Sequence, residues 1–260
     1  MTISFEKYHG TGNDFIMIDN RSGALKLSQE QVQFLCDRHF GIGSDGLILI
    51  ESPQNAGEDF YMNFYNPDGS SSFCGNGSRC AVMYAKNLGI IRDTYKFSAI
   101  DGAHEAQVED HLVAVKMRDV VSIENRGNES YFLHTGSPHV VAYVKDNLNE
   151  LFLEAAALPI RHDSMYAPGG TNVNFIESLS PDAISMRTFE RGVEGETLSC
   201  GTGVTAAALV HGSLNGKQQV EIKTKGGILQ VRFQMSSPNT FQNIFLIGPA
   251  QSVYSGQIHL

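Results

Sequence analysis

The sequence predicts an α/β (α+β) protein of two pseudo-symmetric domains, each a curled, mostly antiparallel or mixed sheet wrapped around a buried central helix. Three observations predict this fold: a repeated Cys-Gly-x-Gly motif, an almost wholly apolar helical stretch after each copy, and short strands with partial alternation nearby. A helix that is hydrophobic all round has to be covered on every side. A sheet that curls around the helix provides that cover.

The repeat begins with Cys-Gly-Asn-Gly at 74–77 and Cys-Gly-Thr-Gly at 200–203. Each motif is followed by a helical stretch, which ends near Gly89 in the first copy and near Gly216 in the second. A strand, a glycine turn and another strand follow each helix. The expected strands are 95–100 and 104–108 in the first copy, and 220–224 and 228–233 in the second.

The two copies divide the chain into halves of like architecture. We expect one domain over 1–120, joined by the C-terminal tail 250–260, and a second over 121–249. Upstream of the cysteines, Gly-Asn-Asp-Phe-Ile at 12–16 is similar to Asn-Val-Asn-Phe-Ile at 172–176. We interpret these two segments as a further equivalent pair.

Two further helices are expected at the periphery. Residues 28–40 open with a Ser-x-x-Gln capping box and stop at Gly41, whereas 146–157 form an amphipathic stretch stopped by Pro159. We expect both helices to cover faces or edges of the sheets.

Composition and charge exclude several classes of protein. The chain has 260 residues and is 42% hydrophobic and 18% charged, which is typical of a globular protein with a substantial core. Its net charge of -9 provides no basic surface for nucleic acid or an anionic membrane, so a small molecule is the expected partner. There is no leader-like or membrane-spanning apolar stretch, which predicts a cytoplasmic protein. The four cysteines predict neither a disulfide scaffold nor a metal site.

Cys74 and Cys200 each precede a buried helix, where unpaired backbone N–H groups favour an anion and lower the pKa of a thiol. The neighbouring glycines let a ligand approach the backbone closely. If the two sites faced each other across a cleft, a thiolate could remove the α-hydrogen of an amino acid while a thiol delivered a proton to the opposite face. This stereoinversion needs no cofactor. Cys36 and Cys80 are interpreted as buried apolar residues.

Four segments carry a family resemblance: YHGTGNDF (8–15), NPDGSSSFCGNGSRC (66–80), GSPH (136–139) and ERGVEGETLSCGTG (190–203). Together they closely resemble the diaminopimelate epimerase family, whose enzymes work without pyridoxal phosphate. The resemblance implies an isomerase that interconverts LL- and meso-diaminopimelate in lysine and cell-wall precursor biosynthesis. It also implies the curled-sheet, two-domain fold of that family.

The resemblance assigns Cys74 and Cys200 as the two acid/base residues, with His139 and Glu190 beside them as groups that assist proton transfer. Tyr254 matches a dimerising tyrosine of the family and implies a homodimer. The residues that the resemblance assigns to substrate binding are Asn13, Asn66, Gly75, Asn76, Asn172, Arg191, Gly201 and Thr202. Among them, Arg191 would grip the distal carboxylate in a bidentate manner.

Two positions depart from the family pattern. Ser137 stands where many members have Asn, so a substrate hydrogen bond there is expected to be shorter in reach or mediated by water. Gly46 stands where some members have Gln, and glycine has no side-chain donor. We expect a local rearrangement of the grip on the substrate.

Other interpretations remain open. Taken alone, His139 could be a structural histidine, Glu190 and Arg191 a surface ion pair, and the candidate asparagines ordinary turn residues. One alternative function is a proline or hydroxyproline racemase or epimerase of the same fold, against which Asn76 and the ERGVEGET run stand. The other is a binding protein for an amino acid, switched by a disulfide between the two motif cysteines.

Overall fold

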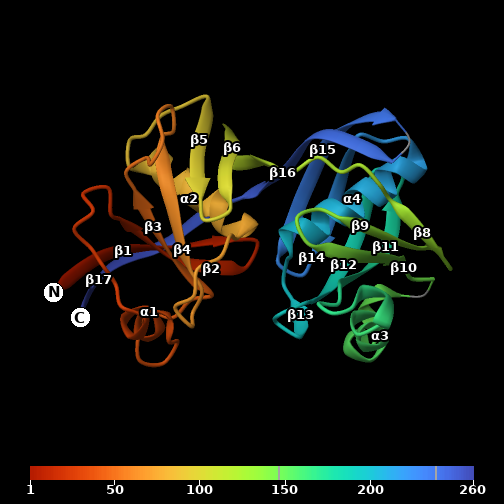
Figure 1. Cartoon of the computed structure of the whole chain (residues 1–260), viewed down its shortest axis with the longest axis horizontal. Coiled ribbons are helices and arrows are strands. Elements are labelled where there is room, and N and C mark those ends of the chain that lie inside the picture. The colour runs from red at the N-terminus through yellow and green to blue at the C-terminus, as the bar shows by residue number, and fades with distance from the viewer. Residues whose placement is uncertain (146, 238) are drawn as a thin grey trace. The chain divides into compact units, whose positions relative to one another are not determined.

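The computed structural model describes residues 1–145, 147–237 and 239–260. It divides into two compact units. Unit 1 comprises Met1–Val115 and Gly248–Leu260, and unit 2 comprises Lys116–Ile247. In each unit a sheet curls around one helix, as Figure 1 shows for α2 and α4. The predicted fold class is therefore confirmed.

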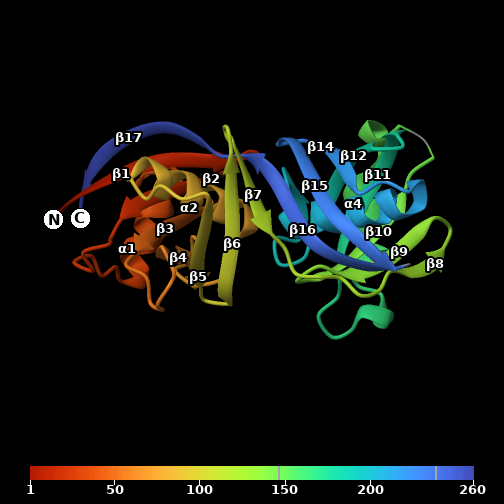
Figure 2. The ribbon, with the colours of Figure 1, turned by 90° about the horizontal axis from the view of Figure 1, so that it is seen from above.

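The sheet of unit 1 runs in the order β17-β1-β2-β3-β4-β5-β6-β7. The pairs β2–β3 and β4–β5 are parallel, and the others are antiparallel. Figures 1 and 2 show β17 lying beside β1, with the two chain ends adjacent. The elements of this unit are β1 (Thr2–Gly10), β2 (Asn13–Asp19), α1 (Gln29–Cys36), β3 (Gly46–Glu51), β4 (Phe60–Tyr65), α2 (Gly75–Asn87), β5 (Thr94–Ala99), β6 (Gly102–Glu109), β7 (Leu112–Lys116) and β17 (Gln251–His259).

The sheet of unit 2 runs in the order β8-β9-β10-β11-β12-β14-β15-β16, with β13 also paired to β12. The pairs β10–β11 and β12–β14 are parallel. The elements of this unit are β8 (Glu124–Gly127), β9 (Ser130–His134), β10 (Pro138–Tyr143), η1 (Leu148–Glu150), α3 (Leu153–Arg161), η2 (Ser164–Tyr166), β11 (Asn172–Ser180), β12 (Ala183–Glu190), β13 (Gly195–Thr197), α4 (Gly201–Asn215), β14 (Gln219–Thr224), β15 (Gly227–Ser237) and β16 (Thr240–Pro249).

The two sheets follow the same pattern of strand pairing. From β1 to β7, and from β9 to β16, successive pairs are antiparallel, parallel, antiparallel, parallel, antiparallel and antiparallel. The helices α1 and α3 occupy equivalent places, as do α2 and α4. The repeat predicted from the two Cys-Gly-x-Gly motifs is therefore confirmed, including the strands that follow each motif.

The predicted equivalence of 12–16 and 172–176 is wrong. The first segment enters β2, which corresponds to β10, whereas the second enters β11, which corresponds to β3. Polar residues leading into an apolar run are a general feature of strand starts. A similarity over five residues of this kind therefore does not show that two strands are structurally equivalent.

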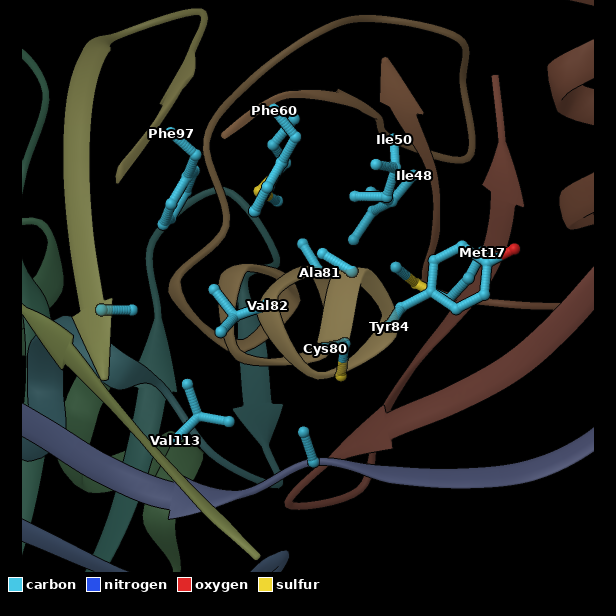
Figure 3. Packing of buried hydrophobic residues seen from close by; sticks show 14 of the residues in the cluster. Met17, Ile48, Ile50, Phe60, Cys80, Ala81, Val82, Tyr84, Phe97 and Val113 are labelled. Atoms are coloured by element: carbon cyan, nitrogen blue, oxygen red, sulfur yellow. The ribbon is translucent and has the colours of Figure 1, made fainter. Parts of the chain in front are cut away.

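Side-chain alternation in unit 1 divides its apolar residues between two cores. Phe15, Met17, Ile48 and Ile50 face α2 in the inner core, and Figure 3 shows α2 with apolar side chains around it. Their neighbours along β2 and β3 point the other way and pack against α1 (Ile16, Ile18, Leu47 and Leu49). Because α1 covers the outer face, these strands are apolar on both sides.

The peripheral helices differ from the prediction at their ends. The capping box of Ser28 and Gln31 is confirmed, but α1 ends at Cys36 because the Asp37 carboxylate accepts backbone N–H groups of the following turn. The predicted stop of α3 at Pro159 is wrong, because the fixed φ of proline is compatible with a helix and α3 continues past it. The start predicted at residue 146 lies outside the described residues. Both helices cover sheet faces, as expected.

We predict that Phe60→Ala destabilises the protein by about 3–5 kcal/mol, because it opens a cavity beside α2. Phe60 is fully buried and stacks on Phe97 with ring centroids 4.9 Å apart. Urea unfolding followed by circular dichroism measures the change. Phe40→Ala is the matched control, since Phe40 is 80% exposed and its truncation should cost no more than about 0.5 kcal/mol. Equal losses for both variants would contradict the packing assigned to Phe60.

Candidate active site

Cys74 is the N-cap residue of α2, and its sulfur accepts a hydrogen bond from the backbone N–H of Gly77 at 3.4 Å. The residue has an extended backbone and is half-buried. A Cβ built on Gly75 would meet nothing within 4 Å, so the first helical residue leaves open space beside the thiol. The positive end of the helix dipole and the free N–H groups favour an anion at this place.

Asn13 and Asn76 lie at the Cys74 thiol. The Oδ1 atom of Asn13 is 3.7 Å from the Cys74 sulfur and accepts a hydrogen bond from the Asn76 amide at 3.3 Å. The Asn13 amide group donates to the Asp45 carboxylate at 2.8 Å. Since a carboxylate only accepts, Asp45 fixes the orientation of Asn13 with its oxygen towards the thiol.

Charged side chains support this arrangement from behind. Arg38 binds both Asp14 and Asp45 at 2.7 Å, and the buried Lys7 pairs with Asp14 at 2.7 Å. Burial opposes ionisation of Asp14, but the hydrogen bonds from Arg38 and Lys7 outweigh it and lower its pKa. Asp14 therefore stays ionised and holds the loop that carries Asp45.

Cys200 is the N-cap residue of α4 and corresponds to Cys74 in the repeat. Its sulfur lies 3.5 Å from the Thr202 hydroxyl. Burial raises the pKa of Glu190, against hydrogen bonds from Thr197 and Cys200 that lower it. A half-buried carboxylate of raised pKa beside a thiol is a better proton acceptor for that thiol than an exposed carboxylate.

His139 is fully buried in the same unit. Its Nε2 atom lies 2.9 Å from the hydroxyls of both Ser137 and Thr202, and its Nδ1 atom lies 3.1 Å from the amide nitrogen of Asn174. Burial lowers the pKa of His139 from 6.5 to about 3, so the ring is neutral at physiological pH. His139 therefore reaches Cys200 through the Thr202 hydroxyl.

The remaining asparagines are held by their own surroundings. Asn66 donates to the hydroxyl and carbonyl of Ser70 within its own turn. Asn172 donates to the Pro138 carbonyl at 2.9 Å and accepts from the backbone N–H of Arg191 at 2.9 Å. These contacts match the turn-stabilising role of asparagine. Asn172 thereby ties β10 to the residue that follows β12.

The Arg191 guanidinium is exposed and, in the part of the chain that the structure describes, forms no hydrogen bond or ion pair. It is thus available to an anionic ligand, unlike Arg187 of the preceding strand, which pairs with Glu196 at 2.7 Å. The surface ion pair considered for Glu190 and Arg191 is not formed. Glu190 instead faces Cys200 and Thr197.

The two departures from the family pattern have different settings. Ser137 bonds His139 and Thr202 and accepts from the Asn172 amide at 3.3 Å, so a short side chain joins three candidate residues. A Cβ at Gly46 would lie 2.4 Å from the ring of Phe64. A glutamine therefore fits at position 46 only if that ring moves.

The remaining expectations concern the other two cysteines, Tyr254, metal binding and membrane spans. Cys36 and Cys80 are buried as predicted, and burial raises the pKa of both thiols, that of Cys80 to about 12. Tyr254 lies on β17, is 46% exposed and packs edge-on against Phe5. The described residues contain no cluster of three or more His, Cys, Asp or Glu side chains that could hold a metal. Over the same ranges, none of the helices is long and apolar enough to cross a membrane.

The prediction from sequence missed two functional candidates, Asp45 and Asn174. Asp45 touches Asn13 across 32 residues of chain, and no local pattern signals such a contact. For Asn174 a signal existed, because alternation along β11 places it on the same face as Asn172.

Residues 5–123 and 131–253 match the family model described as diaminopimelate epimerase. The chain belongs to the diaminopimelate epimerase family. The diaminopimelate epimerase of Flavobacterium psychrophilum is 46% identical over 97% of this chain and 98% of its own length. That of Chlorobaculum tepidum is 46% identical over 96% of this chain and 99% of its own.

Solved structures with little sequence similarity share the fold of this family member. A phenazine biosynthesis protein of the PhzF family from Bacillus anthracis has a TM-score of 0.74 at 14% identity, covering 100% of both chains. A probable proline racemase from Agrobacterium radiobacter has a TM-score of 0.68 at 15% identity, covering 99% of this chain and 93% of its own. At such identities the likeness concerns the fold alone.

We predict that His139 makes the stability of this family member fall in acid. Below about pH 6.5 the unfolded chain binds a proton on His139, whereas the ring in the folded state stays neutral. The free energy of unfolding therefore decreases as the pH falls from about 6.5 towards 3. His139→Gln should flatten the slope of unfolding free energy against pH between about 6 and about 4. Urea titrations at each pH measure it. His39→Gln, at an exposed site, should keep the wild-type slope; an unchanged slope in His139→Gln would refute the assignment.

Proposed function

We propose that the protein is a cofactor-independent epimerase that interconverts LL- and meso-diaminopimelate, with Cys74 and Cys200 as its two bases. One observation carries this proposal in a chain of this family: the two cysteines are the N-cap residues of equivalent buried helices in a repeated unit. We further propose that the two units act as the two domains of the enzyme, each contributing one cysteine.

The reaction is a proton exchange at one carbon. One cysteine, as thiolate, removes the α-hydrogen, and the other, as thiol, delivers a proton to the opposite face, so the configuration inverts and the two thiols exchange protonation states. The α-hydrogen is a weak acid, and when its proton is removed the carboxylate attached to the same carbon gains negative charge. Backbone N–H groups at the start of α2 and α4, with Gly75, Asn76, Gly201 and Thr202, would stabilise that charge.

Glu190 and His139 act on the Cys200 side. Glu190 accepts the proton of the Cys200 thiol, because its raised pKa makes it a stronger base than an exposed carboxylate. His139 is neutral and works through hydrogen bonds rather than as a cation. The Cys74 side has a different support, since its thiol faces the oriented amide of Asn13.

The distal amino acid group of the substrate would bind Asn13, Asn66, Asn172 and Arg191. Arg191 contributes most, because its guanidinium is unpaired in the described part of the chain and can bind a carboxylate in bidentate fashion. We also propose that the enzyme serves lysine and cell-wall precursor biosynthesis in the cytoplasm. It would act as a homodimer whose contact includes the exposed ring of Tyr254.

We predict that Cys74→Ala and Cys200→Ala each reduce epimerisation by about 10²- to 10⁴-fold, because each face of the carbon has its own base. Incorporation of deuterium at the α-carbon in heavy water, followed by mass spectrometry, measures the loss. Cys36→Ala should retain wild-type turnover, since this thiol is buried away from both motifs. Wild-type turnover in either motif variant would exclude the two-base mechanism. If deuterium entered the α-carbon of proline but not that of diaminopimelate, diaminopimelate would be excluded as the substrate.

Arg191→Gln should raise the KM for diaminopimelate by about 10- to 100-fold, the cost of a lost charge-assisted pair of hydrogen bonds. An analogue without the distal carboxylate should be affected far less. Steady-state kinetics with both compounds make the comparison. Arg21→Gln is the control, because Arg21 is already paired with Asp19 at 2.6 Å. Equal losses with both compounds would contradict the role of Arg191.

A further inference from the structure

Three polar side chains lie buried behind Cys200: His139, Asn174 and Thr188. Two of them touch the first turn of α4, since a Cβ built on Gly203 would lie 2.4 Å from Asn174 Oδ1 and His139 bonds the Thr202 hydroxyl. Buried polar groups cost stability unless their hydrogen bonds are satisfied. These three form a connected set with Thr202 and Ser137, so the cost is offset locally.

The repeat shows that the fold does not require polar residues at these places. In unit 1, Phe15 pairs with Gly46 as His139 pairs with Asn172, and Ile48 pairs with Phe64 as Asn174 pairs with Thr188. The equivalents of the three polar residues are therefore Phe15, Ile48 and Phe64, all in the apolar core around α2. An apolar set fills the same space in unit 1. The polar set therefore has a role beyond packing.

The hydrogen bonds of Asn174 determine where His139 carries its proton. The side-chain atom of Asn174 that lies 2.9 Å from the Val140 carbonyl must be the amide nitrogen, because a carbonyl cannot donate. Thr188 donates to the other atom, Oδ1, at 3.0 Å. The same amide nitrogen lies 3.1 Å from His139 Nδ1 and directs its second hydrogen to it. Nδ1 is thus an acceptor, and the neutral ring carries its hydrogen on Nε2.

This tautomer sets the direction of the next hydrogen bonds. With its hydrogen on Nε2, His139 donates to a hydroxyl of Thr202 or Ser137 and accepts from neither. The hydroxyl hydrogen of Thr202 is then free to point at the Cys200 sulfur, 3.5 Å away. A donor to that sulfur stabilises the thiolate form. In the other tautomer, Nε2 would compete with Cys200 for this hydrogen.

We propose that Asn174 is a positioning residue that locks His139 in the Nε2–H tautomer, so that Thr202 donates to Cys200 and favours its thiolate. The effect of this tautomer on catalysis rests on the function proposed above, whereas the assignment of the tautomer does not. Cys74 has no counterpart of the lock, because Phe15 and Ile48 occupy the equivalent places. The inference therefore also assigns different environments to the two bases.

The tautomer is measured directly by long-range ¹H–¹⁵N correlation spectra of the unliganded full chain labelled at histidine. The His139 signals are assigned by their loss in His139→Gln. The wild type should show a neutral ring protonated on Nε2. In Asn174→Asp a carboxylate, which only accepts, should move the hydrogen to Nδ1.

His211 is an internal reference in the same spectra. Its Nε2 lies 2.9 Å from the Ser180 carbonyl and its Nδ1 lies 2.7 Å from the Tyr143 hydroxyl, so it should stay protonated on Nε2 in every variant. An unchanged His211 signal also shows that unit 2 of the variant is folded. A wild-type His139 protonated on Nδ1 would overturn the proposal without any variant.

Alkylation of Cys200 by iodoacetamide tests the effect on the thiol, in a Cys74→Ala background. Asn174→Asp should raise the apparent pKa of alkylation by about one unit, the worth of one hydrogen bond to the thiolate. The charge of the new carboxylate can also raise the pKa of Cys200 directly. The pKa shift caused by Asn174→Asp is therefore measured again in a chain that also carries Thr202→Val. If the shift is carried by the Thr202 hydroxyl, it largely disappears in that background; a shift of the same size would contradict the hydrogen-bond chain. Asn215→Asp, the same change beside His211, should leave alkylation unaltered.

Deuterium exchange at the α-carbon separates this inference from the proposed function. Asn174→Asp should lower kcat by about tenfold or more with a smaller change in KM, since no substrate contact is removed. A wild type that does not exchange diaminopimelate refutes the proposed function and leaves the tautomer result standing. An active wild type whose kcat survives reversal of the tautomer refutes the role of Asn174 alone.

Discussion

The structure depends on the burial of the central turns of two helices, α2 and α4. The buried parts of both helices pack against apolar clusters, so each unit curls its sheet until they are covered and uses an outer helix for the other face of its strands. At the first turn of each helix the unpaired N–H groups and the dipole favour negative charge, and a cysteine is the N-cap residue in both.

Duplication of this unit provides two similar frames with different interiors. Behind Cys74 the frame is closed by aromatic and aliphatic residues, among them Phe15 and Phe64 in edge-to-face contact. Behind Cys200 the same backbone carries a histidine, an asparagine and a threonine joined by hydrogen bonds. A packed core tolerates such an exchange only when every polar atom in it finds a partner. The connected network around Asn174 meets that condition.

The two thiols are therefore oriented by different forces. Asn13, which faces Cys74, is held by ion pairs near the surface, where Arg38 and Asp45 meet. His139, which contacts Thr202 beside Cys200, is held by hydrogen bonds in a site closed to solvent. Surface charges respond to salt and solvent, whereas a buried neutral network does not. The surroundings of Cys200 are consequently more rigidly preorganised than those of Cys74.

The sequence by itself determined the fold class, the repeat, the two buried helices and the positions of the motif cysteines. These features depend on local hydrophobic periodicity and on motifs of adjacent residues. It did not determine which strands correspond: the likeness of 12–16 to 172–176 joins β2 to β11, and only strand pairing shows that β2 matches β10. Nor did it reveal Asp45 behind Asn13 or Asn174 behind His139. Those contacts join residues 32 and 35 positions apart, so they exist only once the sheets have formed.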